Sequence, residues 1–456
     1  MKTIFRLYKG FLVGVTICVG GLLLQAVPIH ATEWFISPGG DDANAGTSET
    51  APFKSLAKAD SMLTAGDTIT VLDGTYPAGR PYGASSITKS GTPNAWITVR
   101  AKNRRAPLFS LAESARLNPG NRDVVEWNSF GLVNVAYIKL IGFSVQGWNP
   151  DHVAVGSGHG ICIQSCHHIL VQDCRVSDCS GAGIGGSPEH WNGGTKLTGP
   201  EDFITVEDNE VSGCAFWCKY DGSGISLWVA KSAGLGADPS GYNMVIRRNI
   251  VHDNANKVGA DGKPIETASD GNGIIIDYFQ DYPYNTLVEG NLVYNNCGRG
   301  ITSTHSSNLT YRYNTCWHNC RNALGIGSGG PWPTGELDSE EGNNVLIEDN
   351  IAVANSQAWS KALVLSAKTV VLKNNLLVGP RVMDKGVNLT ESGTIMDDPK
   401  FINPSVDPKV ADFHLQAGSP ALDAANSTPP PNPDLACTAR PPGTTSDLGA
   451  YQSVKR

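Results

Sequence analysis

The chain has 456 residues, of which 51 are glycine and only 17% are charged, and its formal net charge is −8 at pH 7. A chain so rich in glycine and so poor in charge favours turn-rich β structure over helices, which prefer Ala, Leu, Glu and Lys. The acidic balance argues against a nucleic-acid-binding protein, because neutralising phosphates needs a basic surface. We therefore expect no nucleic-acid partner.

The N-terminus predicts a signal peptide over residues 1–31. Three basic residues precede an apolar run over residues 11–24, and a polar break ends at Ala31. This is the layout of an export signal with cleavage after Ala31. The alternative is an uncleaved membrane anchor, but the run is short for a span, which takes about 20 residues. We expect a secreted or periplasmic protein with no membrane partner after cleavage.

The cysteine count fits an exported protein. The chain has 11 cysteines, and Cys18 lies in the predicted leader. The even number that remains permits disulfides in an oxidising compartment. Zinc is the alternative, but the closest pairs, such as Cys214 and Cys218, lack the compact second pair of a zinc finger.

Residues 32–90 are predicted to hold an N-terminal cap and the first strands. Within residues 52–63, Phe53, Leu56 and Ala59 recur on one helical face, which indicates an amphipathic helix. Such a helix would cap the end of a stacked structure, which otherwise exposes its core. The sheet is then expected to begin at residues 67–72.

Residues 91–395 contain an internal repeat, which indicates the fold. One segment type is a short alternating strand, a polar pair that usually ends in Asn, and a second short strand. Its copies cover residues 169–176, 204–211, 245–251, 287–293, 309–316, 345–352 and 370–377. A glycine-rich strand alternates with them, over residues 158–163, 181–184, 222–227, 271–276, 298–303 and 324–327. Each repeat therefore holds three short strands.

The spacing of the repeat matches one coil of a parallel β-helix. Asn291 and Asn314 are 23 residues apart, and longer spacings are a coil plus an insertion. The recurring Asn predicts an internal ladder of stacked amides, with Cys174 in its first slot. Two other repeat folds fit less well. Leucine-rich repeats need a regular spacing of Leu, and propellers need four strands per unit. We predict an all-β, single-domain right-handed parallel β-helix, a solenoid with three strands per coil and an N-terminal cap helix.

Residues 396–456 are predicted to form a C-terminal coil and a tail. The segment 429–442 is rich in proline. Proline cannot donate to a sheet, so we expect this segment to be irregular and to wrap the last coil.

Motifs at both ends of the chain resemble a known group. They are Trp34-Phe-Ile-Ser-Pro-Gly-Gly-Asp-Asp, Ala51-Pro-Phe-Lys-Ser-Leu, Gly66-Asp-Thr-Ile, Asp73-Gly-Thr-Tyr, Ser419-Pro-Ala-Leu-Asp and Asp447-Leu-Gly-Ala-Tyr. These motifs are similar to the caps of secreted right-handed parallel β-helix proteins of the pectate lyase-like superfamily. The resemblance implies an extracellular protein that acts on a polysaccharide. The superfamily spans lyases, hydrolases, epimerases and non-enzymes, so it leaves the reaction open.

The motif Gly158-His159-Gly160 is left out of the predicted site. A polygalacturonase would carry Asn-Thr-Asp and a paired Asp-Asp ahead of Gly-His-Gly, and those partners do not precede it here.

Outward side chains of the glycine-rich strands are predicted to form columns along the solenoid. Alternation places Ile225 and Leu227 inside and Trp228 outside. Because equivalent positions stack about 4.8 Å apart, Trp228, Asp277 and Thr304 should form one column. Ser223, Asn272 and Arg299 should form a second column in the turn that enters the strand, preceded by Asp221 and Asp270. The insertions 229–243, 255–269 and 327–343 are expected to wall a groove on this face.

Aromatic and carboxylate side chains in this groove are the candidates for sugar binding and catalysis. We predict that Trp228 and Trp217 stack on sugar rings and that Asn272 and Ser223 contact the substrate. Asp277 is an outward carboxylate and is predicted to be catalytic.

The pair Asp221 and Asp270 allows two functions. Stacked carboxylates repel unless a cation bridges them or one keeps its proton. They would therefore hold Ca²⁺ or act as an acid/base pair; the alternative is two turn carboxylates that bind local backbone. Asp270 and Asp277 are about 20 Å apart if the chain between them is extended, which would place them on opposite rims of the groove.

Two basic residues are candidates for proton transfer. Lys219 could act as the base of a lyase, which requires a lowered pKa. Arg299 could neutralise a substrate carboxylate or transfer a proton, and an ion pair with Asp270 is its structural alternative.

Three functions fit this groove. The leading hypothesis is a monomeric polysaccharide lyase that acts on a uronic-acid-containing glycan. A glycoside hydrolase that uses two of Asp221, Asp270 and Asp277 comes second. A non-catalytic glycan-binding surface protein is the third.

Two disulfides are predicted from the repeat. Cys179 and Cys214 follow their ladder positions by the same number of residues, as do Cys297 and Cys320. A rise of about 4.8 Å per coil lies within the Cα separation that a disulfide accepts.

Overall fold

The computed structural model describes one compact unit that begins at Ala31. The described residues are 31–79, 85–118, 120–121, 123–124, 127–156, 158–192, 195–219, 222–258, 261–263, 270–321, 334–427, 433–441 and 446–453. The predicted signal peptide lies outside them except for Ala31. Among these residues, no helix is long and apolar enough to cross a membrane.

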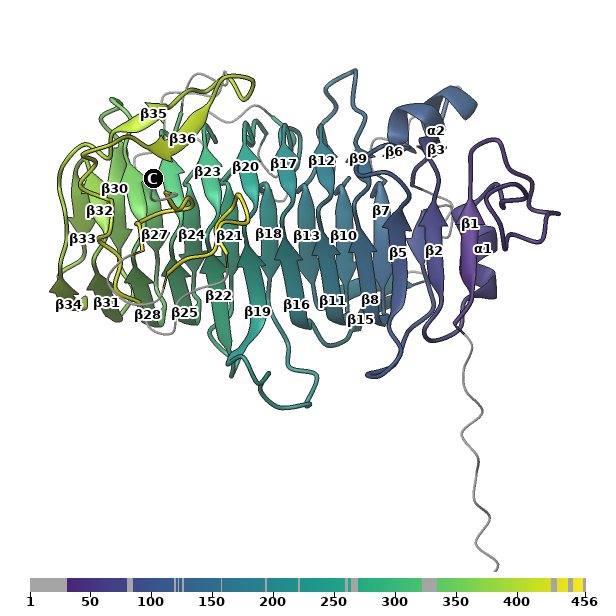
Figure 1. Cartoon of the computed structure of the whole chain (residues 1–456), viewed down its shortest axis with the longest axis horizontal. Helices are drawn as coiled ribbons and strands as arrows, with labels where there is room; N and C mark the ends of the chain where they lie inside the picture. The colour runs from purple at the N-terminus through teal and green to yellow at the C-terminus, as the bar shows by residue number, and fades with distance from the viewer. Residues whose placement is uncertain are drawn as a thin grey trace, which may run out of the picture. The chain divides into compact units, whose positions relative to one another are not determined.

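Three long parallel sheets make up the described structure (Figure 1). Sheet A holds β1 (Glu33–Ile36), β2 (Thr68–Val71), β5 (Ile97–Ala101), β8 (Ala136–Ile141), β11 (His167–Gln172), β16 (Asp202–Glu207), β19 (Tyr242–Arg247), β22 (Asn285–Glu289), β25 (Ser307–Arg312), β28 (Asn343–Glu348), β31 (Thr369–Lys373) and β34 (Asn388–Ser392). Sheet B holds β3 (Gly74–Pro77), β6 (Pro107–Ser110), β9 (Ser144–Gln146), β12 (Arg175–Ser177), β17 (Glu210–Ser212), β20 (Ile250–His252), β23 (Leu292–Tyr294), β26 (Thr315–Trp317), β29 (Ile351–Val353) and β32 (Leu376–Val378). Sheet C holds β4 (Ser86–Ile87), β7 (Phe130–Val133), β10 (Ile161–Gln164), β13 (Ile184–Ser187), β18 (Ile225–Trp228), β21 (Ile274–Asp277), β24 (Ile301–Thr304), β27 (Thr334–Ser339), β30 (Ser360–Leu365) and β33 (Arg381–Met383).

Each coil gives one strand to each sheet, as β10, β11 and β12 do in sequence. Neighbouring coils stack in register, so that Ile225 pairs with Ile274 and Ile274 with Ile301. All three side chains are fully buried, and stacked β-branched residues of this kind form the solenoid core. The prediction of an all-β parallel β-helix with three strands per coil is confirmed.

The elements outside the three sheets are short. They are helices α1 (Leu56–Met62) and α2 (Leu111–Leu117), the hairpin of β14 (Glu189–Asn192) and β15 (Thr195–Thr198), and the hairpin of β35 (Phe401–Asn403) and β36 (Asp412–Leu415). The predicted cap helix is α1. Ser55 Oγ accepts a hydrogen bond from the Lys58 backbone N–H at its start, over 3.1 Å, and Leu56 and Ala59 are buried.

The predicted asparagine ladder runs through the interior. Each amide nitrogen donates to the amide oxygen of the next coil over 2.9 to 3.0 Å, through Asn209, Asn249, Asn291, Asn314, Asn350 and Asn375. Cys174 occupies the first slot, where its backbone N–H donates to Asn209 Oδ1.

A second ladder was not predicted. Asn254 donates to Asn296 and Asn296 to Asn319, over 2.9 and 2.8 Å. Asn319 then donates to Glu336 Oε2 over 2.6 Å. The sequence signal is an Asn five positions after a first-ladder Asn, and Cys214 holds the equivalent slot in an earlier coil.

The predicted disulfides are not formed, although their register is correct. The Ala215 N–H donates to the Cys179 carbonyl over 3.0 Å, which places Cys179 and Cys214 on adjacent coils. Each thiol donates instead to a carbonyl of its own coil, that of Ser177 or Ser212, over 3.3 Å. Cys297 and Cys320 do not form a disulfide either. The Cys179 and Cys214 side chains also hydrogen-bond to each other, which agrees with the predicted stacking.

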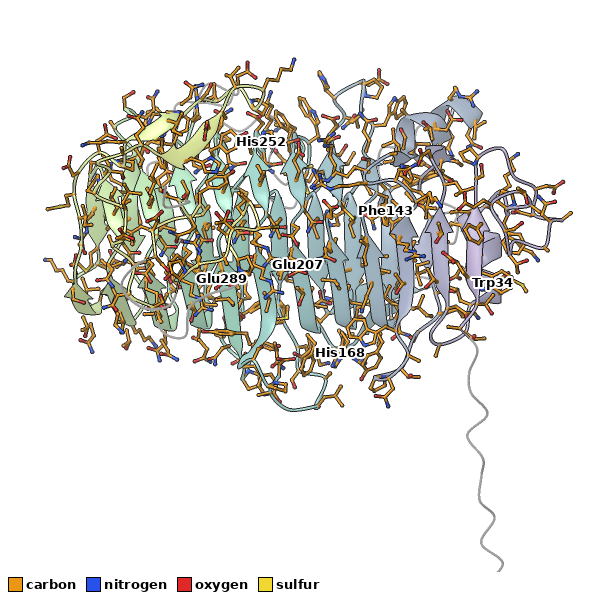
Figure 2. All side chains as sticks on the ribbon, viewed as in Figure 1. Trp34, Phe143, His168, Glu207, His252 and Glu289 are labelled. Carbon is orange, nitrogen blue, oxygen red and sulfur yellow. The ribbon has the colours of Figure 1, made fainter. Side chains whose placement is uncertain are left out.

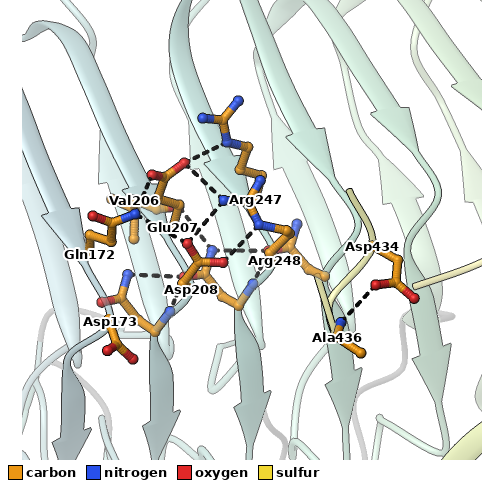
Figure 3. Close-up of polar contacts among 12 residues, drawn as sticks. Gln172, Asp173, Val206, Glu207, Asp208, Arg247, Arg248, Asp434 and Ala436 are labelled. Atoms are coloured by element: carbon orange, nitrogen blue, oxygen red, sulfur yellow. Dashed lines mark hydrogen bonds and ion pairs between the residues drawn. The ribbon is translucent and has the colours of Figure 1, made fainter. Parts of the chain in front are cut away.

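The outer face of sheet A carries a column of alternating charge. Its members, in strand order, are Glu207, Arg247, Glu289, Arg312, Glu348 and Lys373. Arg247 Nε lies 2.5 Å from Glu207 Oε2, and Arg312 Nε lies 2.8 Å from Glu289 Oε1. Figure 3 shows Arg247 and Arg248 around Glu207, and Figure 2 labels Glu207 and Glu289 on this sheet.

Candidate functional site

A cavity of about 600 Å³ lies on the outer face of sheet C. Its lining comes from β10, β13, β18 and β21, from the turns that enter these strands, and from the loop segments at 156 and 218–219. The lining residues are Gly156, His159, Cys162, Ile163, Gln164, Ala182, Gly185, Gly186, Ser187, Cys218, Lys219, Ser226, Trp228, Asp270, Ile275 and Asp277. The cavity therefore includes four of the predicted site residues, which are Lys219, Trp228, Asp270 and Asp277.

Strand alternation places two of these residues side by side. Trp228 pairs with Asp277 and Asp277 with Thr304, which is the predicted column. Ile225 and Leu227 are fully buried, whereas 38% of Trp228 is exposed. An exposed indole next to a carboxylate offers a stacking surface for a sugar ring beside a charged group.

Asp270 reaches the same cavity because the chain turns sharply after it. Gly271 has a φ of 77°, and a Cβ at this position would lie 2.5 Å from the Asn256 backbone nitrogen. Only glycine combines this conformation with this close approach. Asp270 and Asp277 both line one cavity, although the residues from Ile274 to Asp277 form the extended strand β21.

Ser223 and Asn272 hydrogen-bond to Asp270 and do not line the cavity, so their predicted contact with substrate stays a prediction that their position does not support. Both side chains are fully buried. Asn272 Nδ2 donates to Asp270 Oδ1 over 2.7 Å, and Ser223 Oγ donates to the same oxygen over 3.4 Å. Hydrogen bonds to a carboxylate fix its orientation, which a binding or catalytic group needs.

Arg299 does not line the cavity, and its predicted role in proton transfer stays a prediction that its position does not support. Its guanidinium binds Asp338 Oδ2 over 2.9 Å and Glu340 Oε1 over 2.7 Å, and only 14% of its side chain is exposed. Burial alone would lower the pKa of Arg299, but the two carboxylates raise it above its usual value. A permanently charged, ion-paired Arg stabilises the structure and does not exchange protons.

Trp217 lies on a different surface from Trp228. It lines a separate cavity of about 410 Å³ together with Trp148 and Phe216, and its ring stacks on His152 at a centroid distance of 4.8 Å. The segment that ends in Lys219 pairs with Val155 as a β-bridge. The predicted stacking of Trp217 on substrate in the sheet C groove is therefore not supported by its position.

His159 was not predicted and lines the cavity. It stands two residues before Ile161, as Ser223 stands two before Ile225, so it begins the predicted turn column. Its Nδ1 accepts a hydrogen bond from the Ala182 backbone N–H over 2.9 Å, and burial lowers the pKa of the imidazole to about 4. The sequence signal for this residue is the motif Gly158-His159-Gly160, which places a histidine in the turn that enters β10.

Comparisons with known proteins agree with this architecture. A family model described as a right-handed β-helix region matches residues 132–403, more than half of the chain. The chain belongs to the right-handed β-helix family. A second model, described as a Pel9A-like right-handed β-helix region, matches residues 34–198 of this β-helix protein. None of the curated proteins matches it in sequence.

Solved structures resemble this β-helix protein at low identity. The pectate lyase Pel9A is 14% identical, with 92% of this chain and 96% of that chain covered and a TM-score of 0.49. A rhamnogalacturonan lyase is 13% identical, with coverages of 82% and 91% and a TM-score of 0.45. An alginate lyase from Paenibacillus sp. str. FPU-7 is 14% identical, with coverages of 75% and 96% and a TM-score of 0.40.

The predicted Ca²⁺ site is described only at Asp270. Ca²⁺ takes six to eight oxygen ligands, and the described part of the β-helix holds no group of three or more His, Cys, Asp or Glu that could bind a metal. Asp221, the predicted partner of Asp270, lies outside the described residues. The Ca²⁺ hypothesis stays a prediction, and no chemical step is derived from it.

The predicted insertions differ in structure. After Trp228 the chain folds back against β16, where the Ala233 N–H donates to Asp202 Oδ2 over 2.8 Å. Residues 334–339, part of the predicted insertion 327–343, instead form β27 of sheet C. The insertion 255–269 is described only at 255–258 and 261–263, and a Cβ at Gly262 would lie 3.3 Å from Lys219 Cε.

Proposed function

We propose that this protein is an extracellular polysaccharide lyase that acts on a uronic-acid-containing glycan in the sheet C cavity. The observation that carries the proposal is that Lys219, Trp228, Asp270 and Asp277 line one cavity. An aromatic platform with a few convergent charged groups in a concave site is typical of a carbohydrate-cleaving enzyme.

The proposed reaction is β-elimination. The Lys219 amine takes the proton from C5 of the uronate, the freed electron pair forms the C4–C5 double bond, the bond between C4 and O4 breaks, and the proton taken up by Lys219 passes to the leaving oxygen. Trp228 holds a sugar ring beside Asp277. Lys219 is the only Lys or Arg among the described lining residues, which makes it the candidate base.

A glycoside hydrolase is the second candidate, because two carboxylates, Asp270 and Asp277, line the same cavity. Hydrolases use one carboxyl group as an acid and the other as a base or nucleophile. Lyase and hydrolase products differ, since only elimination leaves a carbon–carbon double bond that absorbs in the ultraviolet. A glycan-binding protein without activity is the third candidate and would retain glycan with no product.

A panel of soluble polysaccharides, with and without chelator, tests the proposal when ultraviolet absorbance and new reducing ends are both followed. Lys219→Arg then identifies the base, since Arg keeps the charge but stays protonated near neutral pH. We expect Lys219→Arg to abolish elimination. Full elimination activity of this variant would assign the base to another residue, whereas reducing ends without absorbance would favour the hydrolase.

Asp277→Asn tests whether this cavity is the active site. We expect activity to fall at least about 100-fold, as removal of a charged active-site group does. The free energy of unfolding, measured by heating, should change by less than about 1 kcal/mol, because Asn has nearly the same shape as Asp. Asp41→Asn, at an exposed carboxylate near the N-terminal cap, is the control. Full activity of Asp277→Asn would place the active site elsewhere.

A further inference from the structure

His159 is held in one defined protonation form at the wall of the cavity. The Ala182 N–H donates to Nδ1 over 2.9 Å, and a nitrogen that accepts a hydrogen bond carries no proton. The proton of the neutral ring must then be on Nε2. The His159 backbone is also fixed, because its N–H donates to Asn128 Oδ1 over 3.0 Å and its carbonyl accepts from the Ser129 N–H over 2.8 Å.

The ring lies against Gly185 in the cavity lining. Its Cγ and Cδ2 atoms would lie 3.5 and 3.6 Å from a Cβ on Gly185, which is ordinary van der Waals contact. Gly185 is the outward residue paired with Cys162 and Ser226. A small residue at this position leaves room for the imidazole above the strand. Nε2 has no hydrogen-bond partner among the described residues, although the ring borders a cavity large enough for a sugar.

We propose that His159 is a substrate-binding residue whose Nε2–H donates a hydrogen bond to an oxygen of the bound sugar. The proposal rests on the proposed function, because it assumes that the sheet C cavity binds glycan. Donors such as this one specify the orientation of the substrate, since a buried donor that is left without an acceptor is unfavourable. The hydrogen bond from the Ala182 backbone N–H to Nδ1 selects the tautomer of His159. In histidines generally, the hydrogen bond at one ring nitrogen decides whether the other nitrogen carries the proton.

His159 does not act as the acid or base in this arrangement. Its Nδ1 is occupied, and burial lowers the pKa of the ring to about 4, so it stays neutral at neutral pH. The other titratable groups that line the cavity are Cys162, Cys218, Lys219, Asp270 and Asp277. The proton transfers of the reaction therefore fall to those groups, and His159 only positions the substrate.

Two substitutions of His159 distinguish the role of Nδ1 from the role of Nε2. In His159→Asn the side-chain oxygen takes the place of Nδ1 and keeps the bond from Ala182, but no donor reaches the sugar. In His159→Gln the amide nitrogen takes the place of Nε2 and keeps the donor. We expect KM for the best substrate to rise about three- to tenfold in His159→Asn, with kcat less affected, and to stay within about twofold in His159→Gln, since a neutral hydrogen bond contributes about 0.5–1.5 kcal/mol.

Nitrogen-15 NMR of histidine-labelled wild-type protein provides a test that needs no substrate. His159 is assigned by the signal that disappears in His159→Gln. We expect a neutral Nε2–H tautomer between pH 5 and 8, and an Nδ1–H tautomer would overturn the proposal. Equal KM values for the two variants would overturn it as well. Absence of any activity or glycan retention in the wild type would instead contradict the proposed function.

Discussion

Glu336 at the end of the second asparagine ladder should make the stability of the protein depend on pH. Its side chain is fully buried, and Asn319 Nδ2 donates to its Oε2 over 2.6 Å. Its other oxygen has no hydrogen-bond partner among the described residues. Burial raises the pKa of Glu336 to about 8, although the bond from Asn319 opposes this shift. The folded protein thus keeps a proton that the unfolded chain loses above about pH 4.5.

The expected magnitude follows from this difference in proton binding. Between the unfolded and folded pKa values, each pH unit lowers the free energy of unfolding by about 1.4 kcal/mol. The free energy of unfolding of the wild type should therefore fall by about 4 kcal/mol from pH 5 to pH 8. Glu336→Gln keeps the acceptor for Asn319 and cannot ionise, so we expect this variant to match the wild type near pH 5 and to exceed it by about 4 kcal/mol at pH 8.

Urea unfolding followed by circular dichroism at several pH values measures this difference. Glu49→Gln is the control, because it removes a carboxylate that is about half exposed in its ion pair with Lys102. If Glu336→Gln and the wild type lose stability in parallel from pH 5 to pH 8, the ladder does not end on a protonated carboxyl group.

Two further substitutions test the interior. Asn291→Ala removes an amide that accepts a hydrogen bond from Asn249 and donates one to Asn314. The buried groups left unpaired should lower the free energy of unfolding, measured in urea, by about 3 kcal/mol or more. A loss below about 1 kcal/mol would show that the ladder adds little to stability. Arg299→Gln leaves Asp338 buried without its cation, and we expect it to cost about 3–5 kcal/mol by the same measurement. Arg175→Gln, where the Arg side chain is 52% exposed in its ion pair, should cost less than about 1 kcal/mol, and equal losses would contradict the structural role of Arg299.

The sequence predicted the fold well because alternation and stacking are local rules. The phase of each strand follows from which positions are apolar, so Trp228 and Asp277 were correctly placed in one outward column. The asparagine ladder could be predicted for the same reason, since a recurring Asn at one position of a coil must stack on its equivalents.

The sequence did not reveal features that depend on contacts between neighbouring coils or on the orientation of individual side chains. The partners of Arg299 come from β27 and the residue after it, a segment that was predicted as an insertion. Ser223 and Asn272 were correctly placed in a column, but the tight turn at Gly271 buries them behind Asp270. Cys179 and Cys214 have the predicted stacking, and each thiol also donates to a carbonyl of its own coil.

The alternating charges on sheet A limit how such a chain can grow by duplication of its own coils. An amide donates on one side and accepts on the other, so an asparagine ladder extends by any number of coils. A carboxylate column does not, because a copied coil carrying Glu289 would place two carboxylates about 4.8 Å apart. Copying two adjacent coils together, such as those of Glu289 and Arg312, preserves the alternation. Lengthening of this part of the solenoid should therefore favour steps of two coils, in evolution and in engineered variants alike.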